Sequence, residues 1–146
     1  MKARCSASTA LLGIVAALAL WGPLALARTA THPDLKAEIR VAAIHAGLAV
    51  DMHRIALIHL HLHHVINCLV GVGSHQFDPR AGNPCKGLGN GAIPDSPVSG
   101  SIHFDLMHAL RLAQSGERAT AFAPAHHLAV ETLHVLLLAK RSLVHG

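Results

Sequence analysis

Aromatic residues are almost absent from this chain, which has one tryptophan, three phenylalanines and no tyrosine in 146 residues. Proteins that bind single-stranded nucleic acids combine aromatic stacking faces with a basic groove. Charged residues make up only 14% of the sequence, and they form no basic patch. We therefore expect no nucleic-acid partner.

Recognised catalytic motifs are also missing. The sequence has no P-loop, no dinucleotide-binding glycine fingerprint, no HExxH zinc motif and no Gly-x-Ser-x-Gly nucleophile elbow. It also lacks the CxxCH motif through which haem is attached covalently. No nucleophile, general base or substrate pocket can be named, so the sequence favours a binding protein over an enzyme.

The first 27 residues follow the three-part pattern of a cleavable secretory signal peptide. Lys2 and Arg4 precede an uncharged apolar run at 10–20, and Ala25-Leu26-Ala27 supplies the small-x-small site for signal peptidase. An uncleaved anchor is the rival interpretation, but a membrane span needs about 20 apolar residues and this run is shorter. We predict a periplasmic or secreted protein whose mature part, residues 28–146, is one domain without a membrane span.

The mature part keeps two cysteines, Cys68 and Cys85. An even number of cysteines in an exported protein predicts a disulfide. Such a bridge would close a loop of about 17 residues and stabilise the fold by roughly 3 kcal/mol. The alternative is that Cys68 is a thiolate metal ligand.

Apolar residues recur at helical spacing through most of the mature part, and no strand pattern is found. Between residues 71 and 100, glycine and proline are too frequent for a helix. The sequence thus predicts an all-α small helical bundle with a long Gly/Pro-rich, disulfide-clamped loop. The four helical segments are expected at 34–50, 52–70, 102–114 and 124–144.

Several helix boundaries depend on single residues. Gly47 and Asp51 either separate the first two segments or lie within one continuous helix, and the sequence leaves both open. Ser101 is expected to cap the third segment, because a serine hydroxyl accepts a hydrogen bond from a free N–H at a helix start. Gly116 is expected to end that segment, since glycine is common just past the last helical turn.

Histidine is the exceptional residue, with 14 copies that all follow the predicted cleavage site. Four of them fall within residues 59–64, and residues 55–76 contain no Lys, Arg, Asp or Glu. A solvated helix face normally carries charged residues. We therefore expect these imidazoles to contact another helix, a metal, a cofactor or a second subunit. A homo-oligomer formed through this His-rich helix is a further expectation.

Helical spacing gives the segment at 52–70 an apolar face and an opposite arc that carries histidines. The apolar face consists of Ile58, Leu62, Val65, Ile66 and Leu69. His61 and His64 lie on the opposite arc, together with His53 and Cys68. We predict that His61 and His64 are the first ligands of a metal site.

Further candidate ligands lie on the third and last helical segments. His127, Glu131 and His134 are spaced four and then three residues apart, so they project from one helix face. Glu-x-x-His on an inward face is the arrangement found in carboxylate-bridged two-metal bundles. His108 is the candidate from the third segment. The alternative for the last segment is that this polar stripe simply faces solvent.

With both cysteines in a disulfide, the remaining ligands are nitrogen and oxygen atoms. Such ligands suit Cu(II), Zn(II) or Ni(II), and suit Cu(I) only weakly. We predict an exported His-rich protein that binds a transition metal ion through imidazoles, with metal buffering or delivery as its role.

Two other functions stay open. A b-type haem could be held between facing histidines, and His45 has small neighbours, Ala42, Ala43 and Ala46, that leave space for one. Alternatively, imidazoles that titrate near pH 6.5 could become charged together and open a helix interface. The chain would then be a pH-responsive structural or interaction module.

Overall fold

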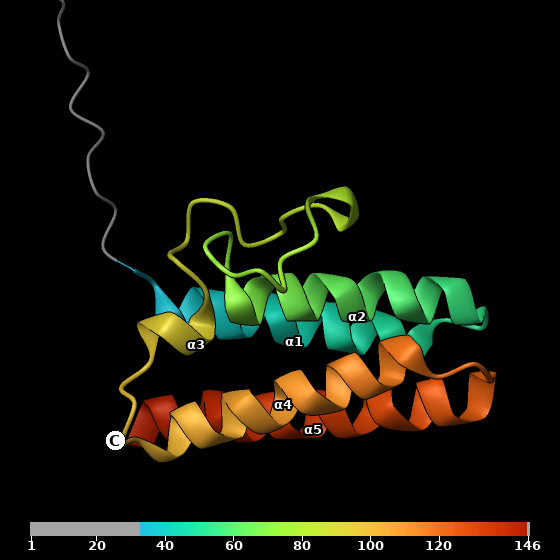
Figure 1. Cartoon of the computed structure of the whole chain (residues 1–146). Coiled ribbons are helices and arrows are strands. Elements are labelled where there is room, and N and C mark those ends of the chain that lie inside the picture. The colour runs from blue at the N-terminus through green and yellow to red at the C-terminus, as the bar shows by residue number, and fades with distance from the viewer. Residues whose placement is uncertain (1–32, 146) are drawn as a thin grey trace, which may run out of the picture.

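The computed structural model describes residues 33–145, so the predicted signal peptide at 1–27 lies outside the described part of the chain. Residues 33–145 are mainly helical and contain no strand, which confirms the predicted all-α fold. Two single turns, η1 (Pro79–Ala81) and α3 (Ala92–Asp95), lie in the loop before the third long helix. The bundle itself has four long helices (Figure 1): α1 (Leu35–Asp51), α2 (Ile55–Val70), α4 (Ser101–Arg118) and α5 (Phe122–His145).

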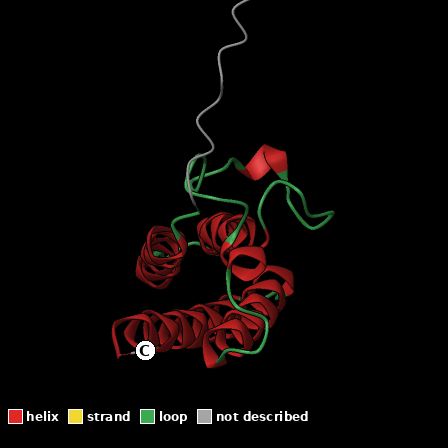
Figure 2. Ribbon diagram, turned by 90° about the vertical axis from the view of Figure 1, so that its left-hand side faces the viewer, coloured by secondary structure: helices red, strands yellow, loops and turns green. Residues whose placement is uncertain are grey.

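The long helices pair as two hairpins, α1 with α2 and α4 with α5. Each hairpin is joined by only a few residues, so its two helices run antiparallel. Across the bundle, α2 packs on α4 and α1 packs on α5. The view in Figure 2 shows the α1–α2 pair lying above the α4–α5 pair.

The sequence left open whether the first two helical segments form one helix or two, and in the first hairpin they form two. Asp34 starts α1 by accepting a hydrogen bond from the Ala37 N–H at 2.9 Å, as N-cap residues do. The helix continues through Gly47 and ends at Asp51. Met52 has extended backbone, and the chain then reverses into α2. The His-rich helix is therefore separate from α1 and packs against it.

The third helix, α4, is longer than the sequence predicted. Ser101 is its first residue and Gly100 is its N-cap, so the prediction that Ser101 caps the helix is wrong by one position. Gly116 lies inside α4 and is buried, so it does not end the helix. A Cβ at Gly116 would lie 2.7 Å from Leu62 Cδ1 and 3.1 Å from Leu128 Cβ. Glycine at this position allows α4 to approach α2 and α5 closely.

The core combines large aliphatic side chains with many alanines. All five residues of the apolar face predicted for α2 are buried. Small side chains reduce the distance between packed helices, and this brings polar groups at the edges of α1 and α2 into contact. The buried alanines of the long helices include Ala42, Ala46, Ala49, Ala109, Ala113, Ala125, Ala129 and Ala139.

The loop between α2 and α4 folds back along α2 (Figure 1). The Sγ atoms of Cys68 and Cys85 lie at disulfide distance, 1.97 Å apart, in agreement with the predicted pair. The prediction that no helical turn forms in this loop is wrong at η1 and α3. Gly71 and Gly91 have φ angles of 68° and 114°, and a Cβ on Gly91 would lie 2.5 Å from the Gly71 nitrogen. Two glycines are thus needed where the loop crosses the end of α2.

One helix of the described chain, α5, is long and apolar enough over Phe122–Leu143 to cross a membrane by length and composition. The core helix of a soluble bundle passes the same test. In this fold α5 packs against α1 and α4, and Ala125, Ala129 and Leu136 are fully buried. The absence of a membrane span stays a prediction.

Candidate metal centre

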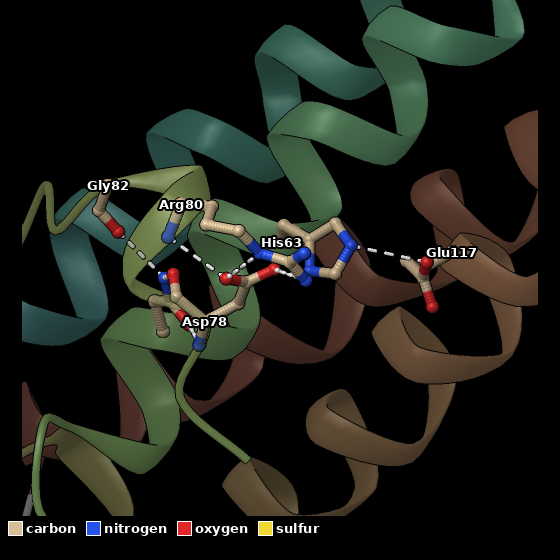
Figure 3. Close-up of polar contacts among 6 residues, drawn as sticks. His63, Asp78, Arg80, Gly82 and Glu117 are labelled. Carbon is tan, nitrogen blue, oxygen red and sulfur yellow. Dashed lines mark hydrogen bonds and ion pairs between the residues drawn. The ribbon is translucent and has the colours of Figure 1, made fainter.

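The histidines of α2 contact other elements on two edges of the helix. On one edge, His59 Nε2 lies 3.0 Å from the Ala119 carbonyl oxygen. His63 Nε2 lies 3.2 Å from Glu117 Oε1 (Figure 3). Both partners lie at the C-terminal end of α4, so these two imidazoles join the two hairpins. The expectation that the imidazoles of this helix contact a neighbouring element is confirmed here.

On the other edge of α2, His61 and His64 face His45 of α1. His45 Nδ1 lies 3.3 Å from His61 Nδ1 and 3.2 Å from His64 Nδ1. One ligand atom from each of the three residues lies within 4.8 Å of the other two. Among the described residues, this triad is the one group of three or more His, Cys, Asp or Glu side chains with such spacing.

The spacing of the triad matches the requirement of a small metal ion. Zinc binds imidazole nitrogen at 2.0–2.1 Å, and tetrahedral angles then place neighbouring nitrogens about 3.3 Å apart. The two Nδ1 separations centred on His45 are 3.2 and 3.3 Å. The three residues are partly buried, so an ion between them would be only partly shielded from water. Two of the three separations therefore match, and these residues could hold a metal ion.

Hydrogen bonding determines which nitrogen of His64 faces the triad. His64 Nε2 lies 2.6 Å from the Ala81 carbonyl oxygen. Because a carbonyl only accepts, Nε2 carries the proton, and Nδ1 of the neutral ring holds a lone pair. His45 Nδ1 contacts two other Nδ1 atoms and can donate one proton to only one of them. A cation would accept all three lone pairs at once.

The loop on both sides of Ala81 is held by Asn67, a fully buried residue one turn beyond His64. Asn67 Nδ2 donates to the carbonyl oxygens of Asp78 and Gly82, each at 2.7 Å. Its Oδ1 accepts from the Asp78 N–H at 2.9 Å. The Asp78 carboxylate in turn pairs with Arg80 (Figure 3). Metal-binding histidines typically have their second ring nitrogen fixed by such a carbonyl.

Burial favours the neutral form of two of the three rings, those of His45 and His61. Burial, followed by the neighbouring His64 and His61, lowers the pKa of His45 from 6.5 to about 4. Burial and His64 also lower the pKa of His61 below 6.5. A metal binds the neutral imidazole in competition with protons. His45 and His61 are therefore in the form that can bind a metal at neutral pH.

The structure brings together two of the six ligands predicted from the sequence, His61 and His64. The other four side chains are exposed on α4 and α5 and lie outside the triad: His108, His127, Glu131 and His134. The alternative that Cys68 is a thiolate ligand is not supported, because its sulfur lies at bonding distance from Cys85.

His45 is the ligand that the sequence analysis did not include in the metal site. The sequence names His45 only as a possible haem ligand, beside its small neighbours Ala42, Ala43 and Ala46. Its alanine neighbours are the available signal, since Ala42, Ala46 and Ala49 are fully buried and permit close packing of α1. The pairing of this edge of α1 with the histidine edge of α2 depends on the tertiary fold.

The triad geometry favours a single ion over a haem. Two histidines that bind haem iron axially lie on opposite faces of the macrocycle, whereas each of these three residues has a ligand atom within 4.8 Å of the other two. Comparison with protein-family models, with curated proteins and with solved structures gives no match for this chain.

Proposed function

We propose that this chain is an exported protein that binds a transition metal ion through His45, His61 and His64. The observation that supports this best is the grouping of three imidazoles, with one ligand atom from each within 4.8 Å of the other two and Nδ1 separations of 3.2 and 3.3 Å around His45. The fixed orientation of His64 supports it further, because its outer nitrogen donates to the Ala81 carbonyl.

The donor set indicates the class of metal. Three imidazole nitrogens without a thiolate suit Zn(II), Cu(II) or Ni(II) and offer little to Cu(I). Three protein ligands also leave a coordination position open for water or an exogenous ligand in a tetrahedral ion. An open position and partial burial allow a bound ion to exchange. Both features fit buffering or delivery of metal outside the cytoplasm better than permanent structural binding.

The test is metal titration of mature protein that has been exported to a bacterial periplasm and purified without an affinity tag. We expect one equivalent of Zn(II) to bind, and Co(II) to give the visible absorption of a four-coordinate site. Replacing His45, His61 or His64 by alanine should weaken Zn(II) binding at least 100-fold. That loss exceeds the roughly 10–100-fold typical of second-shell partners.

The chain offers matched controls for this experiment. His53→Ala and His75→Ala remove exposed histidines outside the triad, and each should leave the affinity unchanged. A combined replacement of His127 and His134 tests the other ligands predicted from the sequence. If that variant loses binding while the triad variants keep it, the site lies on α5 and the proposal fails. Elemental analysis that finds no Cu, Zn or Ni before or after titration would also overturn it.

A further inference from the structure

A cavity of about 590 Å³ lies between the C-terminal end of α2, the loop that follows it and α4. Pockets that hold small molecules typically measure about 300–1,000 Å³ and are mostly apolar. The apolar residues around this cavity are Val70, Val72, Ile93, Val98, Met107 and Leu110. None of the triad residues lines it. Its size and lining are those of a binding site separate from the proposed metal centre.

The rim of the cavity carries apolar side chains that the fold itself does not cover. Val72 is 65% exposed and Val98 is 76% exposed, although both line the cavity. Because both side chains are so exposed, neither contributes to the packed core of the bundle. An apolar molecule seated in the cavity would remove both of them from water, at about 25 cal/mol per Å² of apolar surface.

One wall contains a polar side chain, His103, whose tautomer is set by a neighbouring hydroxyl. The Ser96 hydroxyl donates to the Ile93 carbonyl oxygen at 2.7 Å. Its oxygen lies 2.9 Å from His103 Nδ1, and it accepts the Nδ1 proton because its own proton is already used. In the neutral ring, His103 Nε2 then holds the lone pair. His103 lines the cavity together with Ser74, Gln76 and Asn90, whose side chains are each hydrogen-bonded within the protein. His103 Nε2 is therefore the acceptor for which no protein partner is found among the described residues.

Another part of the wall consists of Asn90, Ile93 and Pro94, which belong to residues 88–96, a segment we call the strap. Its backbone is held by two carboxyl groups. Glu38 Oε1 accepts from the Gly91 N–H at 2.9 Å. Asp95 accepts from the Asn90 N–H at 2.7 Å and from the Asn90 side-chain amide at 2.9 Å. Because these bonds fix the strap, the cavity is already formed before any ligand enters.

We propose that this cavity binds a small, uncharged apolar molecule with one hydroxyl or N–H group that donates to His103 Nε2. The apolar body of the ligand packs against Ile93, Met107 and Leu110, and its outer edge covers Val72 and Val98. The cavity contains no charged side chain, so nothing there would balance a ligand charge. This site does not depend on the proposed metal function.

N-phenyl-1-naphthylamine is a suitable probe, because it is apolar, has one N–H donor and fluoresces when it leaves water. The phenylalanines are the only aromatic side chains of the mature chain besides histidine, so the probe has little background. We expect saturable binding at one site per chain. His103→Leu should weaken binding about fivefold, the effect of losing one neutral hydrogen bond.

A blocking variant gives a stronger test. Gly73 lines the cavity, and a Cβ at this position meets no atom within 4 Å. Gly73→Phe should therefore fold normally and reduce probe binding at least tenfold by filling the mouth. Gly47→Phe is the matched control, because Gly47 on α1 also has open space around it and does not line the cavity.

Three results would overturn the proposal. The first is the absence of saturable probe binding in folded protein, with folding checked by circular dichroism. The second is equal binding by the Gly73→Phe and Gly47→Phe variants, which would place the probe elsewhere. The third is a Soret band on titration with hemin that disappears in His103→Leu, which would assign the cavity to haem.

Discussion

Two clusters of titratable groups lie on the same edge of α1, about two turns apart. One is the triad of His45, His61 and His64. The other is the carboxyl pair, Glu38 of α1 and Asp95 of α3. Glu38 is fully buried, and its Oε2 atom has no hydrogen-bond partner. Both clusters join α1 to the elements around it.

Burial shifts the pKa of Glu38 and the pKa of His45 in opposite directions, and in both residues it favours the neutral form. Burial, with help from Asp95 and Asp34, raises the pKa of Glu38 from 4.5 to about 7, although the Gly91 N–H opposes this. Burial of His45 lowers its pKa to about 4. The acid keeps its proton and the base loses it. The neutral imidazole of His45 has a lone pair that can bind a metal. The neutral carboxyl group of Glu38 instead has one oxygen, Oε2, without a hydrogen-bond partner.

The two clusters also affect stability with opposite dependence on pH. The unfolded chain ionises Glu38 above about pH 4.5, while the folded chain keeps the proton to about pH 7. Stability from this group therefore falls as pH rises between those values. The unfolded chain protonates His45 below pH 6.5, but the folded chain does so only near pH 4. Stability from His45 therefore falls as pH drops, and the two slopes largely cancel between pH 4.5 and 6.5.

The largest effect is expected from replacing Asn67, because this change should weaken the metal site of the triad and not alter the carboxyl pair. Asn67→Ala leaves three partly buried backbone groups of the loop, the Asp78 N–H and the Asp78 and Gly82 carbonyls, without this partner, at about 1–3 kcal/mol each. We expect unfolding in urea to show a loss of about 4 kcal/mol and Zn(II) affinity to fall at least tenfold. Asn83→Ala, which removes a single loop hydrogen bond to the Cys85 N–H, should cost far less. Equal effects of the two variants would contradict a role of Asn67 in orienting His64.

Removal of the cysteine pair is expected to weaken the fold without changing its response to pH. Replacing Cys68 and Cys85 together by alanine frees a loop with a sequence separation of 17 residues. The chain-entropy model predicts a loss of about 3 kcal/mol. Urea unfolding at pH 5 and pH 8 should show this loss at both values. A loss confined to one pH would mean that the bridge and a titrating cluster are coupled.

Glu38→Gln tests how the buried carboxyl pair affects the free energy of unfolding. An amide resembles the protonated acid, so the variant removes the cost of ionising a buried group above pH 7. The shift from 4.5 to about 7 corresponds to about 3 kcal/mol of stability gained at pH 8. At pH 4.5 the variant and the wild type should be equally stable. Glu131→Gln changes an exposed acid and should leave thermal unfolding unchanged at both values.

His45→Gln should have the smallest effect, because His45 keeps partial contact with solvent. In metal-free protein the variant should be about 2 kcal/mol more resistant to acid than the wild type near pH 4, relative to their difference at pH 7. The cause is the removal of a base whose protonation the fold opposes. Thermal unfolding followed by circular dichroism over this pH range measures the effect. His53→Gln, at an exposed position, should follow the wild-type curve.

Local patterns were sufficient to predict much of this fold. Helical spacing identified the four long helices and the buried face of α2, because burial of an apolar stripe follows the 3.6-residue period. The two cysteines of the mature part were enough to predict their pairing. The ends of α4 were predicted less well. Glycine is common where a helix ends, so Gly116 was expected to end α4. It lies inside the helix because it packs closely against Leu62.

The sequence by itself determined that the chain is helical, rich in histidine and equipped with His61 and His64 on one arc of one helix. Only the tertiary structure decided that His45 completes the triad, that α5 presents its polar stripe to solvent, and that Glu38 is buried beside Asp95. Spacing along a helix determines which residues share a face. The choice of partner for that face depends on packing between segments that are distant in the sequence, and a single sequence does not contain that information in any local pattern.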